Sequence, residues 1–148
     1  MTQSDIQKLF EAGQLAGFTN SNVRDLKIET WKAGIANHIP SKLPMGNMAV
    51  YLFFHNKKCL KVGKVGSNSN ARYTSHHYNP KSSQSNLASS LIKDKDSFPD
   101  MDVNNIGHWI KENTTRYNLL IPEKYEKLFL NFSEAFFILM YNPRYEGG

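Results

Sequence analysis

One continuous stretch of this sequence, Ala49–His77 (AVYLFFHNKKCLKVGKVGSNSNARYTSHH), limits the folds open to the chain more than any other. It overlaps the apolar, β-forming run Met48–Phe54, which predicts a central strand covered on both faces. The polar residues that follow predict a turn, and Cys59–Val65 predicts the return strand of an antiparallel hairpin. Gly66 permits a sharp exit, after which serine and asparagine residues can cap a helix over 71–78.

The register of this hairpin decides which polar side chains meet. Side chains alternate between the faces of a strand, so Lys61 and Gly63 share one face of the return strand and Lys64 lies on the other. Tyr51 shares the face of Lys61 and Gly63 if the connecting loop holds an odd number of residues. An even loop separates them, because a shift of one residue moves every side chain to the opposite face.

The remaining segments predict mostly helices. These are helices over 4–16 and 22–37, a short helix from Leu87 to about Asp94, a helical turn over 106–113, a third strand over 116–121 and a long helix over 123–141. With the hairpin, they predict an α+β fold in which a small antiparallel β-sheet of about three strands is flanked by helices. Residues 1–47 are then an N-terminal helical extension, and residues 48–148 form the main domain.

Charge is distributed unevenly along the chain. Between Tyr51 and Lys93 there are seven basic residues and no Asp or Glu, within a formal net charge of +5. The basic residues are Lys57, Lys58, Lys61, Lys64, Arg72, Lys81 and Lys93. A field of one sign favours a polyanionic partner, of which nucleic acid is the commonest. Charge alone leaves open a solvated basic face with no partner.

Several classes of protein are disfavoured by composition. No apolar run approaches the length of a transmembrane helix, and the N-terminus lacks the basic-then-apolar layout of a signal peptide. Cys59 is the single cysteine, so the chain cannot form an internal disulfide and suits a reducing compartment. We therefore expect a cytoplasmic protein with no membrane partner.

Glu134 is unusual because it falls on an apolar stripe of the last predicted helix, between Leu130 and Phe137. A carboxylate there is costly unless a cation or hydrogen-bond donors meet it. Mg²⁺ is one such cation, because it usually takes only one or two protein carboxylates and keeps several waters. The alternative is a structural glutamate paired with a lysine or arginine.

The basic stretch offers three further candidates. Arg72 could hold a phosphate through two hydrogen bonds, or could be a surface arginine of its helix. Tyr51 could be a general base whose pKa is lowered by the Lys61 ammonium, or could be an ordinary core tyrosine. In the latter case Lys61 points to solvent.

The adjacent residues His76 and His77 do not predict a zinc site, because neighbouring side chains of a helix point apart and Cys59 has no paired ligand. His76 lies four residues after Arg72 and therefore on the same helical face. We interpret His76 as a donor to a phosphate or to the Tyr51 hydroxyl, with a solvent-exposed histidine as the alternative.

Taken in order, these residues resemble the GIY-YIG nuclease superfamily. Its members carry a first-strand tyrosine motif, a second-strand tyrosine-hydrophobic-glycine motif, an arginine followed four residues later by histidine or tyrosine, a helical glutamate and a late asparagine. The corresponding residues are Val50-Tyr51-Leu52, Lys61-Val62-Gly63, Arg72, His76, Glu134 and Asn142-Pro143. The resemblance covers about residues 48–146. The run CLKVGKVGSNSNARYTSHHY is most similar to the branch with short type II restriction endonucleases, which tolerates a lysine at the position of Lys61.

The resemblance implies a metal-dependent DNA endonuclease, possibly of restriction type, that hydrolyses phosphodiester bonds with one Mg²⁺. The implied catalytic residues are Tyr51, Lys61, Lys64, Arg72, His76 and Glu134. Tyr51, assisted by Lys61, is the general base. Lys64, Arg72 and His76 bind the scissile phosphate. Glu134 is the metal ligand.

Cutting both strands usually needs two active sites, so a homodimer is expected with DNA as the partner. The alternative is a non-catalytic nucleic-acid-binding module with a degenerate site, which is favoured by Lys61 because most members have tyrosine there. A basic protein-interaction domain is a third hypothesis.

Overall fold

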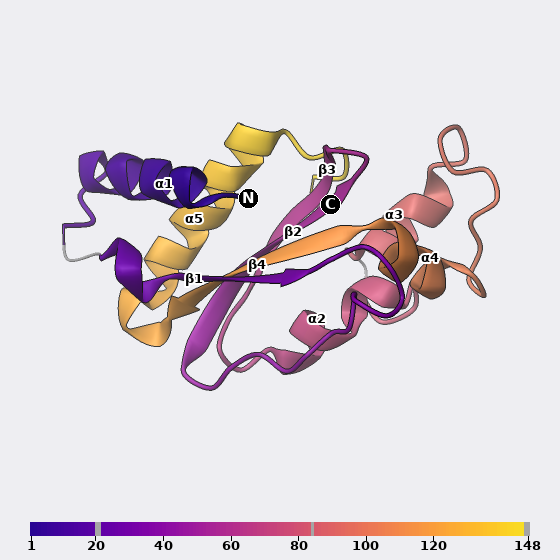
Figure 1. Cartoon of the computed structure of the whole chain (residues 1–148), viewed down its shortest axis with the longest axis horizontal. Coiled ribbons are helices and arrows are strands. Elements are labelled where there is room, and N and C mark those ends of the chain that lie inside the picture. The colour runs from indigo at the N-terminus through magenta and orange to yellow at the C-terminus, as the bar shows by residue number, and fades with distance from the viewer. Residues whose placement is uncertain (20–21, 84, 147–148) are drawn as a thin grey trace.

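The computed structural model describes residues 1–19, 22–83 and 85–146, which form one antiparallel sheet covered by helices (Figure 1). The strands are β1 (Lys27–Trp31), β2 (Asn47–His55), β3 (Lys58–Val65) and β4 (Thr115–Pro122), in the order β1-β4-β2-β3. The helices are α1 (Gln3–Leu15), α2 (Asn70–Thr74), α3 (Leu87–Lys93), α4 (Ile106–Asn113) and α5 (Glu126–Tyr141). Three 3₁₀ turns are η1 (Val23–Asp25), η2 (His76–Tyr78) and η3 (Glu123–Tyr125). The α+β class is confirmed, but the sheet in the described residues has four strands rather than about three.

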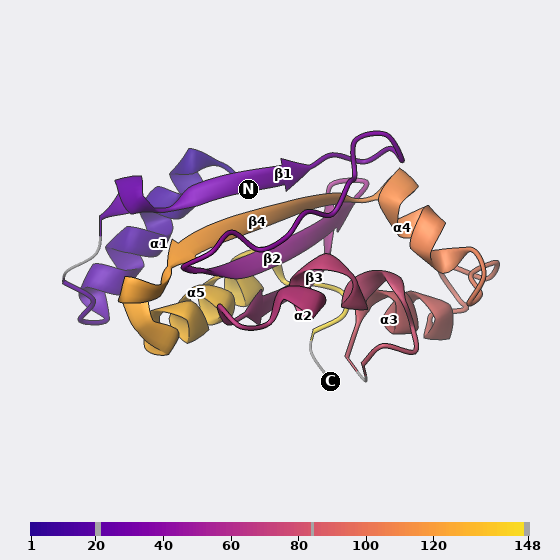
Figure 2. The ribbon, with the colours of Figure 1, turned by 90° about the horizontal axis from the view of Figure 1, so that it is seen from below.

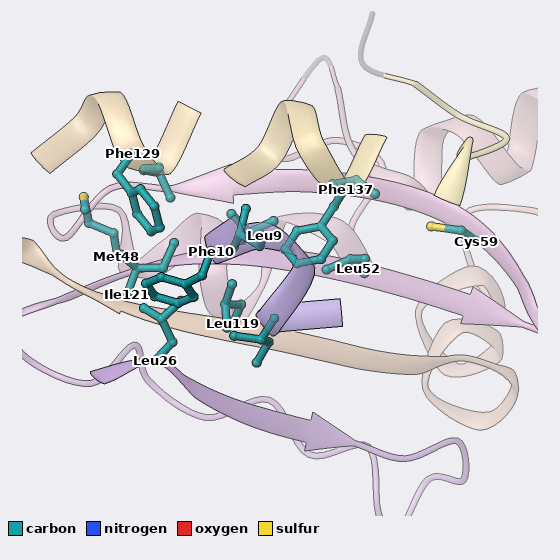
Figure 3. Close-up of a cluster of buried hydrophobic side chains, with 14 residues drawn as sticks. Leu9, Phe10, Leu26, Met48, Leu52, Cys59, Leu119, Ile121, Phe129 and Phe137 are labelled. Atoms are coloured by element: carbon teal, nitrogen blue, oxygen red, sulfur yellow. The ribbon is translucent and has the colours of Figure 1, made fainter. Parts of the chain in front are cut away.

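Helices cover both faces of this sheet (Figure 2). On one face α1 and α5 pack against alternate strand residues in the cluster of Figure 3. Its best-buried members include Ile6, Leu9, Val50, Leu52, Leu119, Ile121, Phe129 and Phe137. On the other face α2, α3 and α4 pack over Tyr51 and Phe53 of β2, and they contribute Tyr73, Leu87, Leu91, Ile106 and Ile110 to the same cluster. Coverage on both faces explains why β2 is a continuous apolar run.

A β-bulge sets the register of the β2–β3 hairpin. The turn holds two residues, Asn56 and Lys57, both with positive φ, as a tight two-residue hairpin turn requires. An even loop alone would place Tyr51 and Lys61 on opposite faces. The register shifts by one residue between Phe53 and Phe54, so that Tyr51 pairs with Gly63. Tyr51, Lys61 and Gly63 therefore do share a face, because the bulge supplies the odd residue.

The predicted helix over 22–37 is wrong. This segment forms η1 and then β1, which pairs antiparallel with β4 at the edge of the sheet. Leu26 and Trp31 are five residues apart, which does not suit one helical face, and they are buried on opposite faces of the sheet. Pairing with β4 overrides the helical pattern because it satisfies backbone groups that β4 would otherwise leave open. The N-terminal region is thus not wholly helical, and it contributes a strand to the same sheet.

The other predicted elements are confirmed with shifted ends. α1 begins at Gln3, with Thr2 and Asp5 forming a reciprocal capping box. The predicted helix over 71–78 is divided at Ser75 into α2 and η2. The last helix begins at Glu126 rather than Glu123, after η3. Among the described residues, no helix is long and apolar enough to cross a membrane.

Candidate active site

Three of the predicted site residues line one hollow, which lies between the end of β3, the start of α2 and the side of α5. We call it the basic hollow, and its polar lining consists of Lys64, Ser69, Arg72, Lys127, Asn131 and Glu134. Its volume is about 480 Å³, which is room for a phosphate group and several waters at roughly 30 Å³ each. Three cations and one carboxylate make it a site for an anion.

Glu134 and Lys64 form an ion pair at the wall of the basic hollow. The Glu134 side chain is 21% exposed and the Lys64 side chain 38% exposed, so both remain open to a ligand. This pair supplies the cation that a carboxylate between Leu130 and Phe137 requires. It also means that Glu134 must exchange Lys64 for any metal ion that it holds.

Tyr51 lies on β2 directly opposite Gly63 and is completely buried. A Cβ atom at position 63 would lie 2.8 Å from Cε2 of the Tyr51 ring and would overlap the hydroxyl. Glycine is therefore required at 63 for the phenol to occupy this place. No hydrogen bond of good geometry reaches the Tyr51 hydroxyl within residues 1–19, 22–83 and 85–146, although the Arg72 guanidinium lies near enough to favour the phenolate by donating to it.

Charged groups from three elements, α2, β4 and α5, affect the ionisation of Tyr51. Burial raises the pKa of Tyr51, and the Arg72 and Arg116 guanidinium groups oppose this rise while the Glu134 carboxylate adds to it. The net effect is a raised pKa, so the predicted lowering is wrong for the DNA-free protein. Lys61 is not among the cations that oppose the rise.

Lys61 is also buried, with 3% of its surface exposed, so the alternative in which it points to solvent is wrong. Its ammonium donates a long hydrogen bond of 3.4 Å to the Ser85 hydroxyl. Burial lowers the pKa of Lys61, the Arg72 charge lowers it further, and Glu134 opposes both. Arg72 and Glu134 therefore affect the pKa of Lys61 as well as that of Tyr51. The ionisation states of Tyr51 and Lys61 both depend on these two charges.

The histidine beside Tyr51 is His77 rather than His76. The His77 ring centroid lies 4.5 Å from that of Tyr51, and the His77 side chain is 1% exposed. His76 belongs to η2 and not to the helix of Arg72, because the chain leaves α2 at Ser75. The expected common helical face of Arg72 and His76 is thus wrong, and His76 is not among the residues that line the basic hollow.

Arg116 and Asn118 of β4 also lie beside Tyr51 on the sheet. Neither was predicted from the sequence as a site residue. Asn118 pairs with Tyr51 across β2 and β4, and Arg116 pairs with Phe53 one step further on. Arg116 and Asn118 are completely buried. Their spacing in the predicted strand was a usable signal, since residues two apart share one face.

The donor set of the basic hollow suits a magnesium ion. Glu134 and Asn131 lie one helical turn apart and offer a carboxylate and an amide oxygen. The described part of the chain contains no group of three or more His, Cys, Asp and Glu side chains that could enclose a metal. An ion here would therefore keep most of its waters or take substrate oxygens, as Mg²⁺ does and structural zinc does not.

No known protein-family model matches the chain, and neither a curated protein nor a solved structure is significantly similar to it. Function is therefore inferred from the geometry of the basic hollow and of the buried residues beside it.

Proposed function

We propose that this protein is a Mg²⁺-dependent DNA endonuclease with a GIY-YIG-like site. The observation that carries the proposal is the basic hollow, where Lys64, Arg72 and Glu134 meet although they are distant in sequence. Tyr51 and Lys61 lie buried on the sheet beside it, within the electrostatic reach of Arg72 and Glu134. Cations around a single carboxylate suit a phosphodiester and its counter-ion better than a neutral substrate.

In this proposal the exposed Arg72 and the half-exposed Lys64 bind the scissile phosphate. Arg72 can grip two phosphate oxygens at once and neutralise the charge that develops on them. Held by Glu134, with Asn131 and waters as further ligands, Mg²⁺ would polarise the phosphate and stabilise the leaving oxygen. His76 does not line the basic hollow and remains only a third proposed donor to the phosphate, after Arg72 and Lys64.

Tyr51 is the proposed general base, assisted by Lys61. Tyr51 is buried in the DNA-free protein, so a role as base requires a path for water to its hydroxyl. In this proposal the path opens when Arg72, which acts on Tyr51 in the DNA-free protein, turns to the phosphate. An attacking water beside the bound phosphate would then reach the phenol. Lys61, whose pKa is lowered by burial, stabilises the phenolate when charged and accepts the proton when neutral.

The test is cleavage of supercoiled plasmid and of linear DNA and RNA by the purified protein with Mg²⁺, and with EDTA as a blank. Glu134→Gln should reduce cleavage at least about a hundredfold, because it removes the only metal-binding carboxylate in the lining of the basic hollow. Glu123→Gln is the matched control, since Glu123 is an exposed carboxylate outside the hollow. Cleavage that survives Glu134→Gln would overturn the metal role, and no cleavage of any nucleic acid would overturn the enzyme proposal.

A non-catalytic nucleic-acid-binding module is the second candidate. It is favoured by the raised pKa of Tyr51 and by the ion pair that occupies Glu134. Binding that weakens steeply with salt, with no cleavage under Mg²⁺ or Mn²⁺, would select this candidate.

A homodimer would supply the two sites that cutting both strands requires. Leu128 and Leu139 on α5 are 66% and 84% exposed and offer apolar surface for such contact. Sedimentation of the protein with and without a DNA duplex tests this, and a monomer on cleaved duplex would contradict it.

A further inference from the structure

Arg116 is the largest fully buried side chain of the described residues. Four aromatic rings enclose its guanidinium. The central carbon lies 4.4 Å from the ring centroid of Trp31, 4.9 Å from those of Tyr51 and Tyr73, and 5.1 Å from that of Phe53. Ring faces attract a cation, but they do not neutralise its charge.

The hydrogen-bond partners of Arg116 are all neutral. Nε donates to the Asn118 side-chain oxygen at 2.7 Å, and Nη1 donates to the Tyr73 carbonyl at 2.9 Å and more weakly to the Tyr78 hydroxyl at 3.5 Å. Nη2 has no partner, and the ion pairs found in the described ranges do not include Arg116. A buried guanidinium without a carboxylate partner lowers the stability of the fold. A functional role therefore explains Arg116 better than a contribution to stability does.

The other unpartnered buried polar atoms of the described chain lie around the same place. They are the Tyr51 hydroxyl, Nε2 of His77 and the side-chain nitrogen of Asn118. Nδ1 of His77 accepts from the Leu87 amide, so the neutral ring carries its proton on Nε2. Three N–H donors without acceptors thus belong to residues that lie against the Tyr51 ring or pair with Tyr51: Arg116 and His77 contact the ring, and Asn118 pairs with Tyr51 across β2 and β4. Unpaired donors beside the ring favour the deprotonated phenol over the neutral one.

We propose that Arg116 is the positioning residue of Tyr51: it packs behind the phenol ring, holds it over Gly63 and stabilises its deprotonated form with an uncompensated positive charge. This proposal rests on the proposed role of Tyr51 as the general base. Arg116 does not touch the substrate in this scheme and acts only through the phenol.

Five ionisable groups face Tyr51 from the elements packed around it. They are Lys61 on β3, Arg72 on α2, His77 on η2, Arg116 on β4 and Glu134 on α5. Burial lowers the pKa of His77 well below its ordinary value, so His77 is neutral at working pH. At Tyr51 the Arg72 and Arg116 charges therefore oppose the single carboxylate of Glu134, and Arg116 is the one of the two that packs directly on the Tyr51 ring.

The first measurement follows the ionisation of Tyr51 without DNA. A fluorotyrosine installed at position 51 ionises nearer neutral pH than tyrosine and is followed by its own ¹⁹F resonance. Arg116→Met should raise its apparent pKa by about one unit or more, and Arg116→Lys should restore part of the shift because it keeps the charge. Arg144→Met is the matched control, since Arg144 also lies over a tyrosine ring, that of Tyr145, and should leave the titration unchanged.

The wild-type chain with the same label gives a second measurement that needs no change at 116. The ¹³Cζ resonance of Arg116 should shift as fluorotyrosine 51 ionises, and a resonance that does not move would overturn the proposal even if Arg116→Met fails to fold.

The third measurement is cleavage, in which the rising limb of the pH–rate profile should move to higher pH in Arg116→Met. An unchanged profile and titration in folded Arg116→Met would overturn the role of Arg116 and leave the nuclease standing. A shifted titration in a protein that cleaves nothing would retain the Arg116–Tyr51 coupling and remove the nuclease.

Discussion

Tyr51 and Gly63 face each other across the β2–β3 pair, and the phenol of Tyr51 fills the space where a side chain at 63 would begin. The bulge after Phe53 creates this pairing, since a regular hairpin with the same two-residue turn would place Tyr51 opposite another residue. A glycine in the middle of a strand usually weakens it. Here it permits a close approach that fixes the proposed base beside the basic hollow.

The first prediction concerns Gly63→Ala. The added methyl group overlaps the Tyr51 ring, which is fully buried and has no free direction to move, so we expect a loss of about 1–3 kcal/mol of unfolding free energy. Cleavage should fall with it because the phenol is displaced. Gly66→Ala is the control, since nothing lies within 4 Å of a Cβ there, and its effect should stay within about 0.5 kcal/mol. Urea unfolding measures both, and equal losses would show that contact with Tyr51 is not the cause.

The second prediction concerns the ion pair of Lys64 and Glu134. Lys64→Met should cost less than about 1 kcal/mol of stability, because the pair is partly exposed. It should tighten the binding of Mg²⁺ to the DNA-free protein several-fold, since the ammonium no longer competes for the Glu134 carboxylate. Titration calorimetry measures this affinity. Lys127→Met removes another cation of the basic hollow that is not paired with Glu134, and it should tighten binding less. Unchanged affinity in Lys64→Met would argue that Glu134 does not hold the metal.

The hairpin, α1 and α5 could be predicted because local patterns and tertiary packing agree there. A continuous apolar run, a polar turn and a second β-forming run specify β2 and β3 without reference to the rest of the chain. β1 could not be predicted in this way. The segment has no strict alternation of polar and apolar residues that would indicate a strand, and only the open edge of β4, contributed by residues almost ninety positions later, makes a strand the better choice.

The candidate site was predicted in part for similar reasons. The types and order of Lys64, Arg72 and Glu134 indicated that they would meet, and they line one hollow. The spacing of Arg116 and Asn118 showed that they share one face of the strand, but the burial of Arg116 could not be predicted, because arginine is among the residue types least often buried. His77 was missed because the break at Ser75 turns it, rather than His76, toward Tyr51.

The third prediction concerns acid stability. His38 is completely buried, its Nδ1–H donates to the Thr114 carbonyl, and its Nε2 accepts from the Tyr78 hydroxyl, an arrangement that needs the neutral ring. Burial lowers the pKa of His38 to about 4. The unfolded state binds this proton below about pH 6.5 and the folded state does not, so stability falls as pH drops from about 6.5 towards 4. The expected slope is about 1.4 kcal/mol per pH unit for this histidine.

Urea unfolding between pH 7 and 4.5 measures this slope. Carboxyl groups with a lowered pKa, such as that of Asp5, affect stability mainly below about pH 4.5. Burial also lowers the pKa of His77, which adds its own slope in this window, so the difference between wild type and His38→Gln isolates His38. His38→Gln should remove about one proton from the slope, whereas His108→Gln, at an exposed position, should leave it unchanged. A wild-type slope that His38→Gln does not reduce would contradict the assignment.

The fourth prediction concerns Cys59, which lies in the core between the sheet and α5 and is 7% exposed (Figure 3). Burial raises the pKa of the Cys59 thiol to about 12, so almost no thiolate is present at pH 8. Because the thiolate is the reactive form, a thiol reagent such as iodoacetamide should modify the folded protein only as fast as it opens. Mass spectrometry should find complete labelling within minutes in 6 M urea and very slow labelling without it. Gly63→Ala should accelerate the labelling of the folded protein in proportion to its loss of stability, because the same opening exposes the thiol. Fast labelling of the stable wild type would contradict the burial of Cys59.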